Sequence, residues 1–261
     1  MFFQETWLAK QELQLCNTLH TEFLSAGVAK VDFSKGILVG RPSGGVSIFY
    51  NNRLANYVTP IFFHDCDWCV AIKFTFNSTS FTLYNVYMPY EKSDNEDEYV
   101  EKLSLLESFI QNVGHSSYAL IGDFNCNIKP ENDRVKSKFA KLLFDFCEIN
   151  SLVFTSQNVL PSDSYTYISE SWGTTSWLDH VISSCDFHNC VNNLNIEYNV
   201  TSNDHIYQFP LMLMCLPCLL SLFVTLIPTV VHKRKYVGRN FWTTNVLCIA
   251  HLLTLFTSNL I

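Results

Sequence analysis

Apolar and polar residues alternate, or apolar residues form short unbroken runs, along much of residues 1–200. Runs of this length that are rich in Val, Ile, Phe and Tyr, and that end at Asn, Gly, Ser or Pro, predict β-strands. Asn77-Ser78 predicts a hairpin turn between two strands, and Asn51-Asn52 predicts another after an earlier strand. The predicted strands cover 45–50, 68–76, 79–88, 118–122, 165–168, 177–183 and 195–200.

Apolar residues spaced three and four apart predict helices in other segments. Residues 96–113 have this spacing, Gly114 closes the segment, and Ser93 and Glu96 have the spacing of a capping box. The apolar stripe consists of Tyr99, Leu103, Leu106, Ile110 and Val113. This segment is the best-marked helix of the chain.

Two more helices are predicted, over 134–147 and, with a weaker pattern, over 9–19. The first buries Phe139, Leu142, Leu143 and Phe146. Many strands in mostly antiparallel order, with a few long helices between them, imply two sheets packed face to face. The predicted fold class is α+β, a four-layer sandwich of two packed, mostly antiparallel β-sheets flanked by helices.

The pattern changes in the last fifth of the chain. Residues 209–231 contain no charged side chain and precede a basic run, His232-Lys233-Arg234-Lys235. That length and flank fit a transmembrane segment. Three prolines (Pro210, Pro217 and Pro228) interrupt the run, so a final core strand followed by a hydrophobic linker fits equally well. We therefore divide the chain into a domain over 1–208 and a hydrophobic C-terminal tail over 209–261.

Composition indicates a folded domain and limits its partners. The 261 residues are 48% hydrophobic and 16% charged, which is enough apolar surface for a sizeable core. Residues 1–205 hold 13 basic and 24 acidic side chains, a net charge of −11. Nonspecific affinity for nucleic acid comes largely from Lys and Arg, whereas clustered carboxylates hold divalent cations. The charge disfavours a simple DNA-binding module more than a metal-dependent enzyme.

Ten cysteines raise the question of disulfides or zinc. The sequence Met1-Phe2-Phe3-Gln4-Glu5 reaches an acidic residue at once and does not resemble a signal peptide, so we expect reduced, mostly buried thiols. Cys66 and Cys69 have zinc-like spacing, as do Cys215 and Cys218. Neither pair neighbours a suitable His pair, which disfavours zinc.

The most informative motif is Gly122-Asp123-Phe124-Asn125, which follows the apolar run 118–121. Side chains at i and i+2 of a strand share a face, so this carboxylate and amide can hold a phosphate and its metal ion. A turn in which both side chains bond their own backbone is the alternative. Other chemistry-bearing residues also fall at strand ends: Glu5, Tyr87, Asp179, His180, Asp204 and His205.

In their order along the chain, these motifs resemble the endonuclease/exonuclease/phosphatase superfamily, the fold of AP endonucleases and DNase I. The resemblance is greatest to the AP-endonuclease-like endonuclease domain of LINE-type, non-LTR retrotransposons, and it covers residues 1 to about 210. It implies a DNase I-like form of the predicted sandwich. Seven motifs carry it: Gln4-Glu5-Thr6-Trp7, Gly44-Gly45-Val46-Ser47-Ile48, Val86-Tyr87-Met88-Pro89, Gly122-Asp123-Phe124-Asn125, Ser164-Tyr165-Thr166-Tyr167, Leu178-Asp179-His180-Val181 and Asp204-His205.

The resemblance implies hydrolysis of a DNA phosphodiester bond that depends on Mg²⁺, or on Mn²⁺ in its place. Glu5 and Asp204 would hold the metal, because carboxylate oxygens are the ligands that Mg²⁺ prefers. His205 and Asp179 correspond to the family's histidine and carboxylate couple, in which the acid orients the imidazole. The remaining roles fall to Asp123, which would orient the water or pass a proton, and to Asn125 and Tyr87, which would bond the phosphate or the leaving oxygen.

Two features depart from the family pattern. Family members begin with a strand upstream of the Glu-bearing one, and that strand brings an Asn to the metal site. We therefore expect a chain shortened at its N-terminus, with an exposed sheet edge, reduced stability and a loosened Glu5. Near the other end, Asn203 replaces the usual Ser, and Ile206-Tyr207-Gln208 precede Phe209-Pro210-Leu211, which predicts a register shift in the last strand.

Three functions remain open. The first is the DNA endonuclease domain of a retrotransposon-derived protein, located in the nucleus or cytoplasm, which nicks one strand. The second is a membrane-attached phospholipid or inositol phosphate phosphodiesterase of the same fold, anchored through 209–231. The third is a non-enzymatic remnant whose metal site no longer assembles. DNA is the expected partner, a membrane the alternative one, and the sequence indicates no protein partner.

Overall fold

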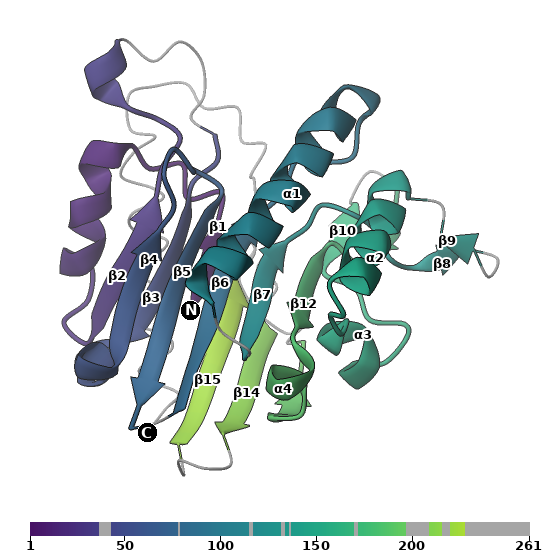
Figure 1. The fold of residues 1–261 in the computed structure, drawn as a ribbon. Helices are drawn as coiled ribbons and strands as arrows, with labels where there is room; N and C mark the ends of the chain where they lie inside the picture. Colours follow the sequence, from purple (N-terminus) through teal and green to yellow (C-terminus); the bar gives the residue numbers. More distant parts are fainter. Residues whose placement is uncertain are drawn as a thin grey trace.

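The computed structural model describes residues 1–36, 43–77, 79–114, 117–131, 134–135, 137–169 and 172–196, and the backbone of two strands at 209–215 and 220–227. Two β-sheets form the centre of the molecule, and helices flank them (Figure 1). The predicted fold class is confirmed. Asp204 and His205 lie outside the described residues.

The five-stranded sheet has the order β12-β7-β6-β5-β4. Its strands pair antiparallel except for β6 and β7, which are parallel because the chain crosses over between them through a helix. The predicted hairpin at Asn77 is confirmed, since this residue has a φ of 50° between β5 and β6. The strands are β4 (Val58–Phe62), β5 (Cys69–Phe76), β6 (Thr79–Tyr87), β7 (Tyr118–Asp123) and β12 (Asp179–Ser183).

The six-stranded sheet has the order β13-β14-β15-β1-β3-β2. Its central strand β1 pairs antiparallel with β3 and parallel with β15. The expectation of an exposed edge beside the Glu5 strand is therefore wrong, because β15 covers that side. The strands are β1 (Phe2–Gln4), β2 (Phe23–Val28), β3 (Val46–Asn51), β13 (Val191–Leu194), β14 (Phe209–Cys215) and β15 (Leu220–Ile227).

The segment that the sequence left open, 209–231, thus contributes strands to a sheet over 209–215 and 220–227. In the part of the chain that the structure describes, no helix is long and apolar enough to cross a membrane. The predicted strand at 195–200 is displaced, since β13 ends at Leu194 and residues 197–200 lie outside the described ranges.

The first predicted long helix is confirmed as α1 (Glu96–Val113), which ends at Gly114 in the left-handed conformation. The capping box is wrong. Residues Ser93–Asn95 form a 3-10 turn, η4, and the Ser93 hydroxyl donates to Asp94 rather than to the helix.

The second long helix, α2 (Lys138–Ile149), begins four residues later than predicted. Ser137 caps it by accepting a hydrogen bond from the Ala140 amide at 3.0 Å. Ahead of it, β8 (Pro130–Glu131) and β9 (Arg134–Val135) form a small hairpin. The segment predicted as a helix over 9–19 is a 3-10 helix, η1 (Lys10–Thr18). The remaining elements are η2 (Phe33–Lys35), η3 (Asn52–Tyr57), α3 (Thr155–Val159), α4 (Cys185–His188), β10 (Tyr167–Ser169) and β11 (Thr174–Ser176).

The main core lies between the two sheets, and smaller apolar layers lie outside each sheet. Phe2 of β1 belongs to the main core, whereas Phe3 packs outward with Phe49 in a cluster that η1 covers. On the other side, α1 lies across the five-stranded sheet next to α2 (Figure 1), where the Tyr99 and Phe139 rings are 4.3 Å apart. These layers are the sandwich that the strand pattern predicted.

The predicted turn at Asn51-Asn52 is not a hairpin. The 3-10 helix η3 begins there, capped by the Asn51 side chain, and carries the chain from β3 in one sheet to β4 in the other.

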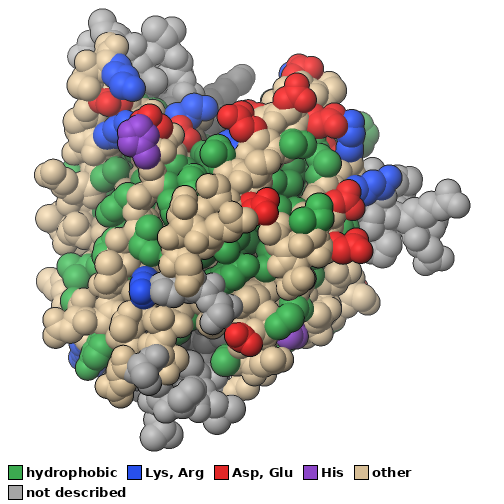
Figure 2. Space-filling view, in the orientation of Figure 1, with side chains coloured by type: hydrophobic (Ala, Val, Ile, Leu, Met, Phe, Trp, Pro, Cys, Tyr) green, Lys and Arg blue, Asp and Glu red, His purple; other side chains and the backbone are tan. Residues whose placement is uncertain are grey.

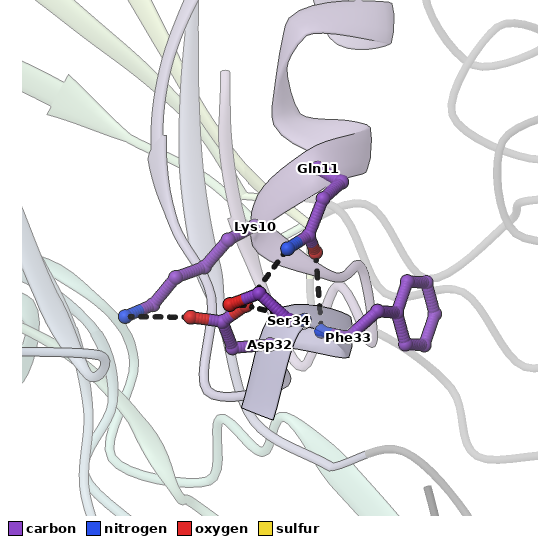
Figure 3. A network of polar contacts seen from close by, with 5 residues as sticks. All are labelled: Lys10, Gln11, Asp32, Phe33 and Ser34. Atoms are coloured by element: carbon purple, nitrogen blue, oxygen red, sulfur yellow. Dashed lines mark hydrogen bonds and ion pairs between the residues drawn. The ribbon is translucent and has the colours of Figure 1, made fainter. Parts of the chain in front are cut away.

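Hydrogen bonds to the Asp32 side chain join η1 to the segment after β2 (Figure 3). One Asp32 oxygen accepts hydrogen bonds from Gln11 Nε2 at 2.7 Å and Ser34 Oγ at 2.6 Å. Hydrogen bonds from Ser34 and Gln11 lower the pKa of Asp32 to about 2.

The cysteines whose side chains are described are free thiols, which confirms the predicted reduced state for this part of the chain. Burial raises the pKa of Cys16 and of Cys66 to about 11. At neutral pH these thiols are protonated and behave as small apolar side chains.

Candidate active site

Three predicted site residues stand in one row across neighbouring strands. In the parallel pair β6–β7, Tyr87 is the register partner of Asp123, and in the antiparallel pair β7–β12, Asp123 is the partner of Asp179. The row lies where β6 and β7 end and β12 begins. Residues from distant parts of the sequence therefore meet at one end of these neighbouring strands of the five-stranded sheet.

Gly122 makes this row possible. It has a φ of +150°, and a Cβ atom at this position would lie 2.0 Å from the Val86 carbonyl oxygen. Only glycine tolerates such an approach between β7 and β6. The glycine in the motif thus allows the strand that carries Asp123 to lie close to the strand that carries Tyr87.

Asp123 and Asn125 form a local turn as well as contributing to the site. The backbone amide of Asn125 donates to Asp123 Oδ1 at 2.8 Å, and the side-chain Nδ2 of Asn125 donates to the Met88 carbonyl at 2.8 Å. Asn125 has a φ of 51°, a left-handed conformation that asparagine tolerates better than most residues. The turn interpretation of the motif is therefore confirmed, and this turn leaves Asp123 beside Tyr87 and Asp179. The binding of a phosphate and its metal ion stays a prediction.

Glu5 reaches the row from the other sheet. The Tyr87 hydroxyl donates a hydrogen bond to Glu5 Oε1, which joins β6 to the residue that follows β1. Glu5 has a φ of 50°, and a left-handed non-glycine residue costs roughly 1–2 kcal/mol. Such strain is concentrated at functional sites in proteins.

Gly44 and Gly45 hold the strained segment in place. The Thr6 amide donates to the Gly45 carbonyl at 3.1 Å, and the Trp7 amide donates to the Gly44 carbonyl at 3.0 Å. A Cβ atom on Gly45 would lie 2.7 Å from Thr6 Oγ1. These contacts explain the paired glycines of the Gly44-Gly45-Val46-Ser47-Ile48 motif.

Asp179 is buried, and Thr166 positions it. Thr166 Oγ1 accepts hydrogen bonds from the Leu178 amide at 2.9 Å and the Asp179 amide at 3.1 Å. Asp179 Oδ1 has no hydrogen-bond partner among the described residues. Burial raises the pKa of Asp179 to about 7, and a hydrogen bond with Thr166 limits the rise.

The pKa values of Asp123 and Tyr87, the other two residues of the row, are also raised, which favours their protonated, neutral forms. Burial, and then the charge of Asp179, hold the pKa of Asp123 well above its usual range. Burial and the nearby Glu5 raise the pKa of Tyr87, so its phenol stays protonated at neutral pH. Two neighbouring buried carboxyls of this kind retain a proton that an isolated carboxylate would lose.

His180 follows Asp179 in β12 but points to the opposite face. Its Nε2 donates to the Cys126 carbonyl at 3.1 Å, and its ring lies among those of Phe124, Phe154 and Trp177. Burial lowers the pKa of His180 to about 4, so the ring is neutral. His180 is a core residue, and it lies outside the site.

The chemistry of these donors fits a divalent cation. Glu5, Asp123 and Asp179 have hard carboxylate oxygens. Burial, and then the charge of Asp179, raise the pKa of Asp123, and a cation would offset the second of these causes. Within the described ranges, no three His, Cys, Asp or Glu side chains are grouped closely enough to hold a metal ion. The predicted second ligand, Asp204, is outside those ranges.

The sequence did not identify three residues that support the site. In the sequence, Thr166 stands out only as one residue of the Ser164-Tyr165-Thr166-Tyr167 motif, with no role of its own. Gln4 stands next to Glu5, and Asn85 lies two residues before Tyr87 on the same face of β6. The contacts that give these residues a role cross between strands far apart in the chain, and no local pattern reports them.

Solved structures of two AP endonucleases share this fold. The AP endonuclease LMAP of Leishmania major matches with a TM-score of 0.60 at 15% identity, over 80% of this chain and 76% of that one. An AP endonuclease of Archaeoglobus fulgidus matches with a TM-score of 0.54 at 14% identity, over 76% and 80%.

The endonuclease domain of TRAS1, a telomere-specific non-LTR retrotransposon, matches with a TM-score of 0.50 at 12% identity, over 78% of this chain and 94% of that domain. No protein-family model and no curated protein sequence matches the chain. At these identities, the likeness concerns the fold.

Proposed function

We propose that this protein is a metal-dependent DNA endonuclease, derived from a retrotransposon, that hydrolyses phosphodiester bonds. The observation that carries the proposal is the meeting of Tyr87, Asp123 and Asp179 in one row, with Glu5 bonded to Tyr87 from the opposite sheet. The matched structures include two AP endonucleases and a retrotransposon endonuclease domain, which supports nucleic acid as the substrate class.

Each residue of the row has a chemical role in this proposal. Asp123 would accept a proton from the attacking water in its ionised form, which a bound cation would favour by offsetting the charge of Asp179. Tyr87 keeps its hydroxyl hydrogen at neutral pH and would donate it to a phosphate or leaving oxygen when the hydroxyl turns from Glu5. Asn125 turns its carboxamide toward a phosphate oxygen when the contact with Met88 opens.

The sheet register supports a place for Asp204 and His205 beside this row. Phe209, the first residue of β14, pairs with Leu226 of β15, and Leu226 pairs with Phe2 of β1. β14 runs antiparallel to β15, so the chain enters β14 from the sheet edge at which Glu5 leaves β1. We propose that His205 and Asp179 act as a catalytic couple in which the carboxyl orients the imidazole. Asp179 Oδ1 has no hydrogen-bond partner among the described residues.

Glu5 and Asp204 would hold the metal ion, for which we propose Mg²⁺ or Mn²⁺. When bound, the ion supplies charge neutralisation to the phosphate. The same register argument extends the catalytic domain beyond residue 208. We propose that it includes the C-terminal hairpin (β14 and β15, residues 209–227), because this hairpin pairs with β13 and β1.

The surface formed by Lys129 and the β10–β11 hairpin, near Asp179, favours DNA over a lipid substrate. The hairpin β10–β11 adjoins Thr166 and exposes two aromatic rings, Tyr167 at 48% and Trp172 at 83%. Close by, Lys129 Nζ donates to Thr175 Oγ1 at 3.0 Å and lies 5.2 Å from the centre of the Tyr165 ring. Exposed aromatic rings beside a cation suit stacked bases and a phosphate backbone.

The helical face is a poorer candidate for binding DNA. Figure 2 shows acidic side chains spread over the face that carries α1 and α2, with few basic ones among them. The first turn of α1 alone contains Glu96, Asp97 and Glu98. This face would repel phosphates, so we place the DNA at the edge with Lys129 and the β10–β11 hairpin.

Purified full-length chain should nick supercoiled plasmid in the presence of Mg²⁺ or Mn²⁺, and Asp204→Ala should abolish the nicking. Vesicles containing phosphatidylinositol phosphates test the alternative phospholipase function in parallel. Release of inositol phosphates without plasmid nicking would move the proposal to the lipid alternative. Stable folding without either activity and without metal binding would identify a non-enzymatic remnant.

A further inference from the structure

Besides the Tyr87–Glu5 contact, a second polar contact joins the two sheets, and it lies in their buried core. Asn85 of β6 accepts a hydrogen bond from Gln4 Nε2 at 2.5 Å and donates through Nδ2 to the Phe3 and Ser47 carbonyls, each at 3.0 Å. One carboxamide therefore connects β6 of the five-stranded sheet with β1 and β3 of the six-stranded sheet. We call the pair Gln4 and Asn85 the inter-sheet clamp.

The clamp lies directly beside the contact that brings Glu5 to the row. Asn85 and Tyr87 are two residues apart on the same face of β6, and Gln4 and Glu5 are neighbours at the end of β1. The clamp bonds β1 one residue before the chain enters the strained conformation at Glu5. The Gln4–Asn85 and Glu5–Tyr87 hydrogen bonds both join β6 to the end of β1. Together they fix the position and the orientation of the Glu5 backbone.

Stability alone is a poor explanation for these side chains. Asn85 and Gln4 are 0% and 1% exposed, and buried amides are costly unless all their polar atoms are bonded. Gln4 Oε1 and the nearby Ser47 hydroxyl have no partners among the described residues. Apolar side chains of similar size would fill this position between two hydrophobic sheets without that cost. What an apolar pair would not supply is a directional bond that sets one strand against the other.

We propose that Asn85 is a positioning residue which, through Gln4, holds Glu5 against Tyr87 and so preforms the metal-binding and catalytic site. This inference rests on the proposed function for its catalytic consequence. Its structural consequence, a Glu5 carboxylate preformed for a divalent cation, is measurable without any nuclease activity.

The test uses the full-length chain, with Mn²⁺ alone as the probe in calorimetry and supercoiled plasmid as the substrate in kinetics. Asn85→Ala removes all three bonds of the Asn85 side chain, whereas Gln4→Met removes only the bond between Gln4 and Asn85 and leaves those to the Phe3 and Ser47 carbonyls. Leu83→Ala is the matched control, because Leu83 is 1% exposed and lies two residues before Asn85 on the same face of β6. The control makes a cavity in the same core but leaves every clamp bond in place.

Asn85→Ala should weaken Mn²⁺ binding at least fivefold and lower kcat at least tenfold, with KM for DNA changed less than twofold. Gln4→Met should give a smaller change of the same kind, because Asn85 keeps its bonds to the Phe3 and Ser47 carbonyls. The double variant should be no worse than Asn85→Ala, because Asn85→Ala already removes the bond that Gln4→Met would remove. Leu83→Ala should lower thermal stability yet keep Mn²⁺ affinity and kcat within twofold of the parent. If Asn85→Ala fails to fold, Gln4→Met carries the same comparison.

Unchanged Mn²⁺ affinity in both clamp variants, or equal losses in Leu83→Ala, would overturn the positioning role. If the parent chain binds Mn²⁺ without nicking DNA, the proposed endonuclease function fails, while the affinity comparison still decides the role of the clamp. A parent chain that binds no Mn²⁺ would contradict both proposals.

Discussion

The two sheets build the candidate site in different ways. The five-stranded sheet supplies Tyr87, Asp123 and Asp179 from strands that pair side by side and that the sequence marks by apolar runs or alternation. The six-stranded sheet supplies Glu5 from a three-residue strand, β1, whose neighbour β15 comes from the far end of the sequence. Tyr87, Asp123 and Asp179 are thus held by neighbouring strands of one sheet, whereas Glu5 is held by a strand pair, β1 and β15, whose members lie near opposite ends of the sequence.

This difference indicates where the site is vulnerable. Long-range pairing between strands costs more loop-closure entropy and forms later in folding than local pairing. Glu5 thus depends on β15, on Gly44 and Gly45, and on the inter-sheet clamp. The Asp123 row depends mainly on one close approach between strands, at Gly122.

The largest expected effect comes from removing the C-terminal hairpin. A chain ending at residue 208 leaves β1 with β3 as its one partner in the described sheet and β13 without β14. We expect its unfolding free energy to fall by about 5 kcal/mol or more, which is a large share of the stability of an ordinary domain. Urea denaturation followed by circular dichroism measures this loss. A chain ending at residue 230 is the control, and equal stability of the two chains would show that the hairpin does not support β1.

The next effect tests the five-stranded sheet. Gly122→Ala places a Cβ atom 2.0 Å from the Val86 carbonyl oxygen, at a φ of +150°. The expected loss of unfolding free energy is about 3 kcal/mol or more, because strands β6 and β7 must separate. In the control Gly173→Ala, φ is +60° and a Cβ meets nothing within 4 Å, so only about 1 kcal/mol should be lost. Similar losses in the two variants would remove the close approach as the cause.

A third prediction concerns the charge of the row. The pKa of Asp179 is about 7 in the folded chain, against about 3.9 when unfolded, so the folded state binds a proton that the unfolded state releases. The stability contributed by this group is full below pH 4 and is lost as pH rises through 7, by about 4 kcal/mol at most. Asp179→Asn should flatten this slope and stabilise the chain at pH 8, while lowering nicking. Denaturant titrations at pH 5 and pH 8 provide the comparison, and an unchanged slope would contradict it.

The smallest effect is expected away from both halves of the site, at Asp32. Its pKa is lowered to about 2, so its ionised form stabilises the fold above about pH 4, and that stabilisation is lost as pH falls toward 2. Asp32→Asn should therefore lower the melting temperature slightly at pH 7 and leave it unchanged at pH 2. A difference between the two proteins that persists at pH 2 would assign the effect to packing instead of charge.

The elements that the sequence predicted well are those with strong local patterns. The helix α1 has five apolar residues at helical spacing and a glycine at its end, and strands β5 to β7 alternate clearly. The hairpin of β14 and β15 was harder to predict, because the long uncharged run fits a membrane segment and a final core strand with a hydrophobic linker equally, and the structure has two strands there. Its assignment depends on a distant partner, β1, that no local window contains.

The same distinction applies to the site. Tyr87, Asp123 and Asp179 stand in recognisable motifs, and the structure brings them together. The shifted pKa of Asp179 follows from burial, which the sequence does not report. The bond between Gln4 and Asn85 joins two amides that look ordinary in the sequence, and only the packing of one sheet on the other gives them a role.

The most direct test of the central claim is the rate at which the full-length chain nicks plasmid when single carboxylates of the row are neutralised. Asp123→Asn keeps the size of the side chain and removes the proposed base, whereas Asp145→Asn does the same to an exposed carboxylate on α2. We predict a loss of at least about a hundredfold for Asp123→Asn, as expected for a general base, and an unchanged rate for Asp145→Asn. Equal rates in the two variants would contradict the assignment of this row as the catalytic centre.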